Sequence, residues 1–172
     1  GQADTLEQLA QGFAERVRRI GNADAVAIRW SDEGNERYLL LASSGLPVAM
    51  SEAEHCLPTG SCHCGQPVQQ AGTRVIPIQA QDTEGPQALG HCAQFGYRTL
   101  VSVPVKVHQR MLGEIDLFFR QPPEARGSEE ESLFEALAAH LASAMEGLRA
   151  AAMEKESAVA GERALIARVA EM

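Results

Sequence analysis

The sequence lacks an apolar run of about 18 residues, and its N-terminus shows no charged segment followed by an apolar stretch and small residues. We therefore expect neither a membrane-spanning helix nor a signal peptide. It also lacks a basic patch, because its 15 Lys and Arg residues are scattered among 23 Asp and Glu residues, for a formal net charge of -8. Phosphate backbones would repel such a chain, so nucleic acid binding is not expected.

Cysteine is scarce, at four residues in 172. Secreted domains held together by disulfides are shorter and much denser in cysteine, so we expect a protein of a reducing cytoplasm. With 45% hydrophobic residues, the chain is long enough for one packed domain with an appendage. Three of the four cysteines fall within residues 56–65, CLPTGSCHCG, and their spacing matches no zinc-finger pattern of two close pairs.

Hydrophobic periodicity and turn residues predict an α+β domain with two antiparallel hairpins. In chain order the expected elements are a helix at 5–20, strands at 25–30 and 38–43, a short helical turn at 51–54, a strand at 74–78, a helix at 86–95, and strands at 99–107 and 111–119. The last two strands are the most strongly β-branched and aromatic, with His108-Gln109-Arg110 as their turn.

A long helix is predicted from residue 129 to the end of the sequence, opened by a capping box of Ser128 and Glu131. At about forty residues it would be roughly 60 Å long, more than a domain of this size can bury. Its apolar residues recur with coiled-coil spacing, interrupted by Lys155 and Glu162. The repeating residues are Leu137, Leu141, Ala144, Leu148, Ala151, Ala158, Leu165, Val169 and Met172. We expect packing on the domain up to about residue 148 and a partner helix beyond it.

Five short motifs give the chain its resemblance to a GAF domain. They are LASSGL at 41–46, PTG at 58–60, FGYRTL at 95–100, VPV at 103–105 and LGEIDL at 112–117. The resemblance covers about residues 5–150. It implies a PAS-related, mostly antiparallel sheet with the N- and C-terminal helices on one face and a ligand cavity on the other. Residues 151–172 would then form a coiled-coil signalling helix.

The cysteine stretch is similar to that of the central GAF domain of NarX-type nitrate and nitrite sensor histidine kinases. Residues 161–168, GERALIAR, also resemble the opening of the dimerisation helix in that class, but VAEM follows here instead of the motif with the phosphoacceptor histidine. The segment would therefore not be a kinase by itself. The resemblance implies a cytoplasmic sensory domain, without membrane contacts of its own, in a parent protein anchored in the inner membrane. It also implies a homodimer through the N- and C-terminal helices that signals to the kinase region of the same parent chain.

The cysteines admit three chemical interpretations. Cys56, Cys62, Cys64 and Cys92 could supply four thiolates to zinc or to an iron–sulfur cluster. Two of them could instead form a reversible disulfide, with Cys62 or Cys64 activated near a helix N-terminus and Cys92 as the partner. Individual cysteines could also be inert core residues, in which case no cofactor is expected.

An enzymatic alternative comes from a second resemblance within the GAF fold, to the free methionine-R-sulfoxide reductases. The Cys-Gly pair at 64–65 and the His-Cys pair at 91–92 are similar to two motifs of that family. By this resemblance Cys92 would attack the sulfoxide sulfur, and Cys56 or Cys64 would resolve the adduct as a disulfide.

A small anion such as nitrate needs no charged side chain if backbone amides at a helix start hold it. The sequence offers such a start near Cys64 and Gly65. Trp30, at the end of the first strand, could face the same cavity. The ligand-binding residues expected from the sequence are therefore Trp30, Cys64 and Gly65.

Overall fold

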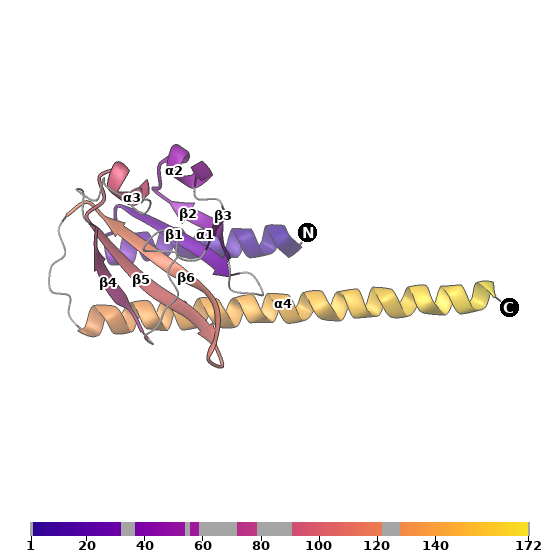
Figure 1. The fold of residues 1–172 in the computed structure, drawn as a ribbon. Coiled ribbons are helices and arrows are strands. Elements are labelled where there is room, and N and C mark those ends of the chain that lie inside the picture. Colours follow the sequence, from indigo (N-terminus) through magenta and orange to yellow (C-terminus); the bar gives the residue numbers. More distant parts are fainter. Residues whose placement is uncertain are drawn as a thin grey trace.

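The computed structural model describes residues 2–31, 37–53, 56–58, 72–78, 91–121 and 128–171 (Figure 1). Its elements in chain order are α1 (Gln2–Gly21), β1 (Ala25–Ser31), β2 (Arg37–Ser44), α2 (Val48–Ala53), β3 (Cys56–Pro58), β4 (Arg74–Pro77), α3 (His91–Gln94), β5 (Thr99–Val107), β6 (Arg110–Phe119) and α4 (Ser128–Ala170). Among these residues, no helix is long and apolar enough to cross a membrane.

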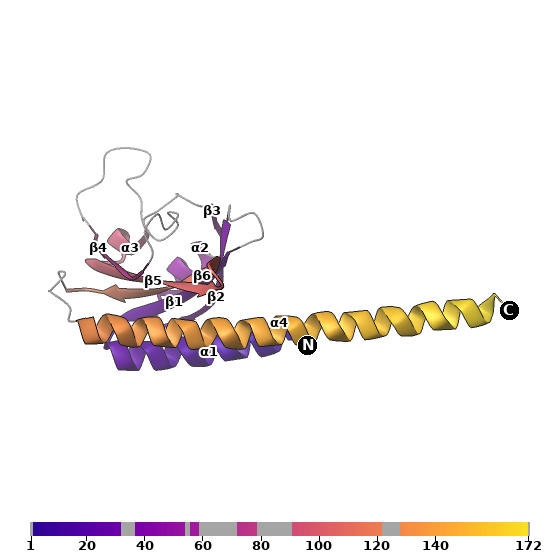
Figure 2. The same ribbon diagram turned by 90° about the horizontal axis from the view of Figure 1, so that it is seen from below.

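The described strands form one six-stranded sheet in the order β3-β2-β1-β6-β5-β4. Every neighbouring pair is antiparallel. Helices α1 and α4 lie side by side against one face of the sheet, and the short helices α2 and α3 lie on the other (Figure 2). This confirms the predicted α+β architecture, with an antiparallel sheet flanked by the terminal helices.

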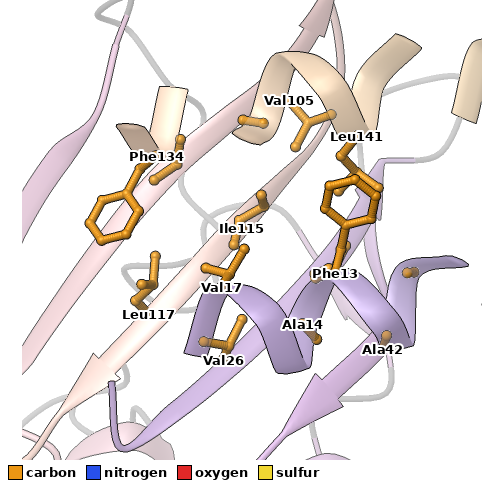
Figure 3. Packing of buried hydrophobic residues seen from close by; sticks show 14 of the residues in the cluster. Phe13, Ala14, Val17, Val26, Ala42, Val105, Ile115, Leu117, Phe134 and Leu141 are labelled. Carbon is orange, nitrogen blue, oxygen red and sulfur yellow. The ribbon is translucent and has the colours of Figure 1, made fainter. Parts of the chain in front are cut away.

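An apolar cluster, the helix-side core, fills the space between the sheet and the two long helices (Figure 3). Helix α1 contributes one face of its amphipathic pattern, as predicted, and α4 contributes residues of its first half. The largest contributors are Phe13, Val17, Val26, Ile28, Val103, Ile115, Leu117, Phe134, Leu141 and Met145. Each fully buried side chain of this size stabilises the fold by about 1.5–3 kcal/mol. The core therefore fixes α1 and the first half of α4 to the sheet.

A smaller apolar cluster, the second core, lies on the opposite face of the sheet. Its buried members are Ala25, Ala27, Met50, Ile78, Cys92, Tyr97, Leu100 and Phe118. Met50 comes from α2 and Cys92 from α3, so this cluster attaches both short helices to the sheet. Along β1 the residues of this face are Ala25, Ala27, Arg29 and Ser31, because side chains alternate along a strand. The face is therefore apolar at one end of β1 and polar at the other.

The predicted elements differ from the observed ones at a few positions. Strand β3 was not predicted, and of the helix expected at 86–95 the described residues show His91–Gln94. Helix α2 begins at Val48 rather than at Ser51, because the Ser51 amide donates to the Pro47 carbonyl, 2.9 Å away, as in a helix interior. The hairpin turn lies where predicted, with positive φ angles of 49° at His108 and 65° at Gln109.

Helix α4 extends far beyond the sheet (Figures 1 and 2). It spans 43 residues, close to the predicted extent. Its buried residues end at Met145, whereas every described side chain between residues 154 and 171 is exposed. The long helix is thus observed, and its pairing in a coiled coil stays a prediction.

Candidate functional site: a buried polar cluster on the sheet

A group of polar side chains lies on the face of the sheet opposite α1 and α4. Residues paired across antiparallel strands point to the same face, and the register pairs Arg29 with Glu114, Asp116 with Ser102, and Ser102 with Arg74. We call this group the polar cluster; its members are Arg29, Tyr38, Arg74, Ser102, Glu114 and Asp116. It continues the face that begins with Ala25 and Ala27, and therefore borders the second core.

The centre of the polar cluster is an ion pair without solvent access. Arg29 Nε donates to Asp116 Oδ2 over 2.9 Å, and both side chains have an exposed fraction of 0%. Beside them, Ser102 Oγ donates to Glu114 Oε2 over 3.1 Å. Two carboxyl groups and a guanidinium therefore share one dry surface, where their interactions are much stronger than in water.

Burial sets the protonation of the carboxyl and phenol groups here. Burial, and then the negative charge of Asp116, raise the pKa of Glu114 well above its usual value, against the opposing effect of Arg29. Burial, followed by the charges of Glu114 and Asp116, raises the pKa of Tyr38 to about 12, while Arg74 opposes the shift. Glu114 thus favours its neutral acid form, and Tyr38 stays a phenol at any physiological pH.

Glu114 and Arg74, both members of the polar cluster, carry buried polar atoms for which the described part of the structure shows no hydrogen-bond partner. These atoms are Oε1 of Glu114 and both Nε and Nη2 of Arg74. Most buried polar groups in proteins are hydrogen-bonded, and an unsatisfied one costs about 1–3 kcal/mol. In its acid form the Glu114 carboxyl group also hydrogen-bonds with Asp116, so the guanidinium of Arg74 is the group of this cluster whose buried donors remain unpartnered.

The structure places one predicted cysteine in full. Cys92 lies in α3 with an exposed fraction of 2%, among the apolar residues of the second core. The backbone of Cys56 belongs to β3 and pairs with Leu39 at the outer edge of the sheet. The Cys56 side chain and residues Cys62, Cys64 and Gly65 fall outside the described residues. The four-thiolate site, the disulfide and the amide-bound anion at Cys64 and Gly65 all stay predictions.

Trp30 does not lie where the sequence analysis expected it. It follows Arg29 in β1 and so points to the opposite face, where it packs against the helix-side core. The expectation that Trp30 faces a ligand on the other side of the sheet is therefore wrong. Over the described side chains there is also no group of three or more His, Cys, Asp or Glu residues that could hold a metal.

The polar cluster was not among the predicted sites, although the sequence carries a signal for it. Arg29 interrupts the apolar strand AVAIRW, and Glu114 and Asp116 stand two residues apart in LGEIDLFF. Charged residues two positions apart in an otherwise apolar strand point to the same face of the sheet. Where both faces of the sheet are covered, these charged side chains are buried within the protein.

The model of the GAF domain family matches residues 5–145. The chain belongs to this family. A search of curated proteins gives no match. Among solved structures, this GAF domain is similar to a domain assigned to a two-component sensor histidine kinase of Sinorhizobium meliloti, with 15% identity and a TM-score of 0.69 over 87% of this chain and 96% of that one.

Two further structures share the fold of this GAF domain. The second GAF domain of DevS from Mycobacterium smegmatis is 14% identical with a TM-score of 0.63, over 88% of this chain and 99% of that chain. The type II free methionine-R-sulfoxide reductase of Thermoplasma acidophilum is 17% identical, also with a TM-score of 0.63, over 83% and 93% of the two chains. At such identities the likeness establishes the fold alone.

Proposed function

We propose that this GAF domain is the sensory domain of a NarX-type nitrate and nitrite sensor histidine kinase. The observation that carries the proposal is α4, a single helix that packs under the sheet and continues well beyond it. A rigid element of this kind links events on the sheet to a distant catalytic region. The domain would be cytoplasmic, in a parent protein anchored in the inner membrane, with the kinase region following in the same chain.

The contacts of α4 provide a route for the signal through the sheet. Thr73 Oγ1 donates to Glu135 Oε1 of α4 over 3.3 Å, and the next residue, Arg74, belongs to the polar cluster on the other face. At the β5–β6 hairpin, Arg110 Nη2 and Glu146 Oε2 of α4 are 3.7 Å apart. A ligand that displaces β4 or β5 therefore acts on α4 across the thickness of one sheet.

The distal part of α4 supports a homodimer. Four apolar side chains beyond the sheet are exposed, with exposed fractions of 39% for Val159, 61% for Leu165, 60% for Ile166 and 62% for Val169. Leu165 and Val169 belong to the predicted heptad repeat, and the other two each follow one of its residues in the sequence. A second copy of the same helix, with α1 contributing nearer the sheet, is the occupant that fits the heptad spacing of the sequence. The signal would be nitrate or nitrite, or else a redox or metal change at Cys56, Cys62, Cys64 and Cys92 involving zinc, an iron–sulfur cluster or no cofactor.

The proposal predicts a dimer whose affinity depends on the ligand. In sedimentation equilibrium we expect the chain to form a dimer, and removal of residues 151–172 to weaken association at least tenfold. Sodium nitrate or sodium nitrite should change the dissociation constant, whereas sodium chloride at equal ionic strength should not. A monomer at high concentration with or without residues 151–172 would contradict the dimer, and equal effects of all three salts would contradict nitrate sensing.

A second candidate function is the reduction of free methionine-R-sulfoxide. It is favoured by the position of Cys92 on the same face as the polar cluster, in the adjoining second core. In this reading Cys92 is the nucleophile and Cys56 or Cys64 the resolving thiol. We expect no dithiothreitol-dependent turnover of free methionine-R-sulfoxide under the sensory proposal. Turnover that is lost in Cys92→Ser would establish the enzyme instead.

A further inference from the structure

Glu114 and Asp116 lie two residues apart on one face of β6, beside Arg29 of β1. Both carboxyl side chains belong to residues with an exposed fraction of 0%. A strand advances about 3.3 Å per residue, so the two side chains leave it about 6.6 Å apart and can meet above it. Asp116 Oδ2 accepts a hydrogen bond from Arg29, and Glu114 Oε2 accepts one from Ser102. The second oxygens of the two carboxyl groups, Oδ1 and Oε1, are buried as well.

The charges of this group balance only if one carboxyl group carries a proton. Arg29 is the cation that acts on Glu114, and it already forms an ion pair with Asp116. If Glu114 were also ionised, two carboxylates would share one guanidinium in a place without solvent. An uncompensated buried charge is strongly destabilising. A neutral Glu114 removes that charge and supplies an O–H group that the Asp116 carboxylate can accept.

A hydrogen bond joins the two carboxyl groups in this state. The acid form of Glu114 forms it with Asp116. Since Oε2 and Oδ2 already serve Ser102 and Arg29, we place this bond between Oε1 and Oδ1. Burial, and then the charge of Asp116, hold the pKa of Glu114 well above its usual value, against the opposing effect of Arg29. A bond to an ionised acceptor is roughly twice as strong as one between neutral groups.

The residue between the two carboxyl groups connects them to the long helices. Ile115 points to the opposite face of β6, as successive residues of a strand do. It has an exposed fraction of 1% and belongs to the helix-side core, together with Val17 of α1 and Leu141 of α4 (Figure 3). Protein cores are packed closely enough to transmit small displacements. Repulsion that separates Glu114 from Asp116 therefore also shifts Ile115 against α1 and α4.

We propose that Glu114 and Asp116 together bind one proton, and that release of this proton changes the packing of β6 on α1 and α4. The ligand of this site is the proton itself, so the domain responds to pH independently of nitrate or nitrite. With the proton bound, the carboxyl pair carries one negative charge, which Arg29 balances. Release of the proton adds a second negative charge to the same buried surface.

The bound proton makes stability depend on pH in one direction. The charged and titratable groups on this face of the described strands are Arg29 of β1, Tyr38 of β2, Arg74 of β4, and Glu114 and Asp116 of β6, with Cys92 of α3 in the adjoining second core. Folding raises the pKa of Glu114 above the value of about 4.3 in an unfolded chain. The stabilisation is therefore complete below that pH and is lost as pH rises through the folded pKa, by up to about tenfold in the folding constant per pH unit.

Infrared spectroscopy of the whole chain in deuterium oxide tests for the proton, because a protonated carboxyl group absorbs separately from a carboxylate. At about pH 6, where exposed carboxyl groups are ionised, we expect one protonated carboxyl group per chain. Glu114→Gln should lack its band, because the amide donates to Asp116 without a titrating proton. Asp116→Asn should lack it too, because Glu114 then ionises as the partner of Arg29. Glu154→Gln, which changes an exposed carboxyl group of α4, is the control and should keep the band.

Two pH titrations test the effect on the helix side of the sheet. Trp30 is the one tryptophan of the sequence; it follows Arg29 and packs on the helix-side core. Its fluorescence should change with the same midpoint as the infrared band, and Glu114→Gln should lack this change. In urea denaturation, the folding constant of the wild type should fall relative to that of Glu114→Gln as pH rises above about 4.3, by up to about tenfold per pH unit.

Each part of the proposal has a result that would overturn it. A wild type without a protonated carboxyl band at about pH 6, or a band that survives in Glu114→Gln, would exclude the proton site. A band that survives in Asp116→Asn would show that Glu114 holds the proton alone. An infrared transition without a change in Trp30 fluorescence would exclude the effect on the helix side. Circular dichroism establishes that each variant is folded, and Glu114→Gln still decides the proton site if Asp116→Asn does not fold.

Discussion

Arg29→Met should lower the free energy of unfolding by about 3–5 kcal/mol, measured by urea denaturation followed by circular dichroism. The substitution removes the guanidinium that lies 2.9 Å from Asp116 in a position without solvent. The Asp116 carboxylate would then remain buried beside Glu114, with loss of the charge that offsets its desolvation. Methionine fits the volume of the arginine stem, so the loss reports on the charge rather than on a cavity.

The double variant Arg29→Met, Asp116→Leu distinguishes loss of the charge interaction from loss of packing. It removes both charges and leaves an apolar contact between β1 and β6, so we expect it to recover most of the stability lost in the single variant. Arg98→Met, at an exposed position, should change stability by less than about 0.5 kcal/mol. A double variant no more stable than Arg29→Met would show that the arginine acts through packing.

Gly113→Ala should destabilise the domain by about 3 kcal/mol or more. Gly113 lies in β6, between Trp30 of β1 and Val105 of β5. An added Cβ would overlap the backbone carbonyl oxygen of Arg29, and a backbone atom in the centre of a sheet cannot turn aside as a side chain can. The strands would have to separate at the position that carries the polar cluster.

Gly147→Ala is the matched control for this prediction. Gly147 lies in α4, and a Cβ there meets no atom within 4 Å. Alanine has the higher helix propensity, so we expect a gain of about 0.5–1 kcal/mol. Equal stability of Gly113→Ala and the wild type in the same denaturation experiment would show that β1 and β6 are not packed as closely as the structure has them.

Local sequence patterns were sufficient for most of the elements. The hairpin of β5 and β6 was predicted from its β-branched residues and its turn. The start of the long helix α4 was predicted from its capping box. Both signals lie within one continuous stretch of the chain. Strand β3 was not predicted because its three residues are too few to show the alternation of apolar and polar residues that marks a strand. Its strand character comes from pairing with β2, which is a tertiary effect.

The candidate site depends on strand order, which local patterns do not contain. Arg29 and Asp116 are 87 residues apart and meet because β6 inserts beside β1. The predicted chemical role of the cysteines rested on their spacing in the sequence, and Cys92, the cysteine whose side chain the structure describes, lies in an apolar cluster. The charged residues of β1 and β6 indicate a functional surface more strongly than the cysteines do. Their position on one surface follows only from the pairing of the two strands.

The two halves of α4 hold their backbone hydrogen bonds for different reasons. Amides near Phe134 and Leu141 lie in the helix-side core, so they exchange with solvent deuterium only as the domain unfolds. Amides between residues 154 and 171 belong to a segment with exposed side chains, and a helix held by its propensity alone frays readily. A second helix packed on that segment would slow its exchange, so the rate of deuterium uptake at residues 154–171 reports whether this part of α4 is paired.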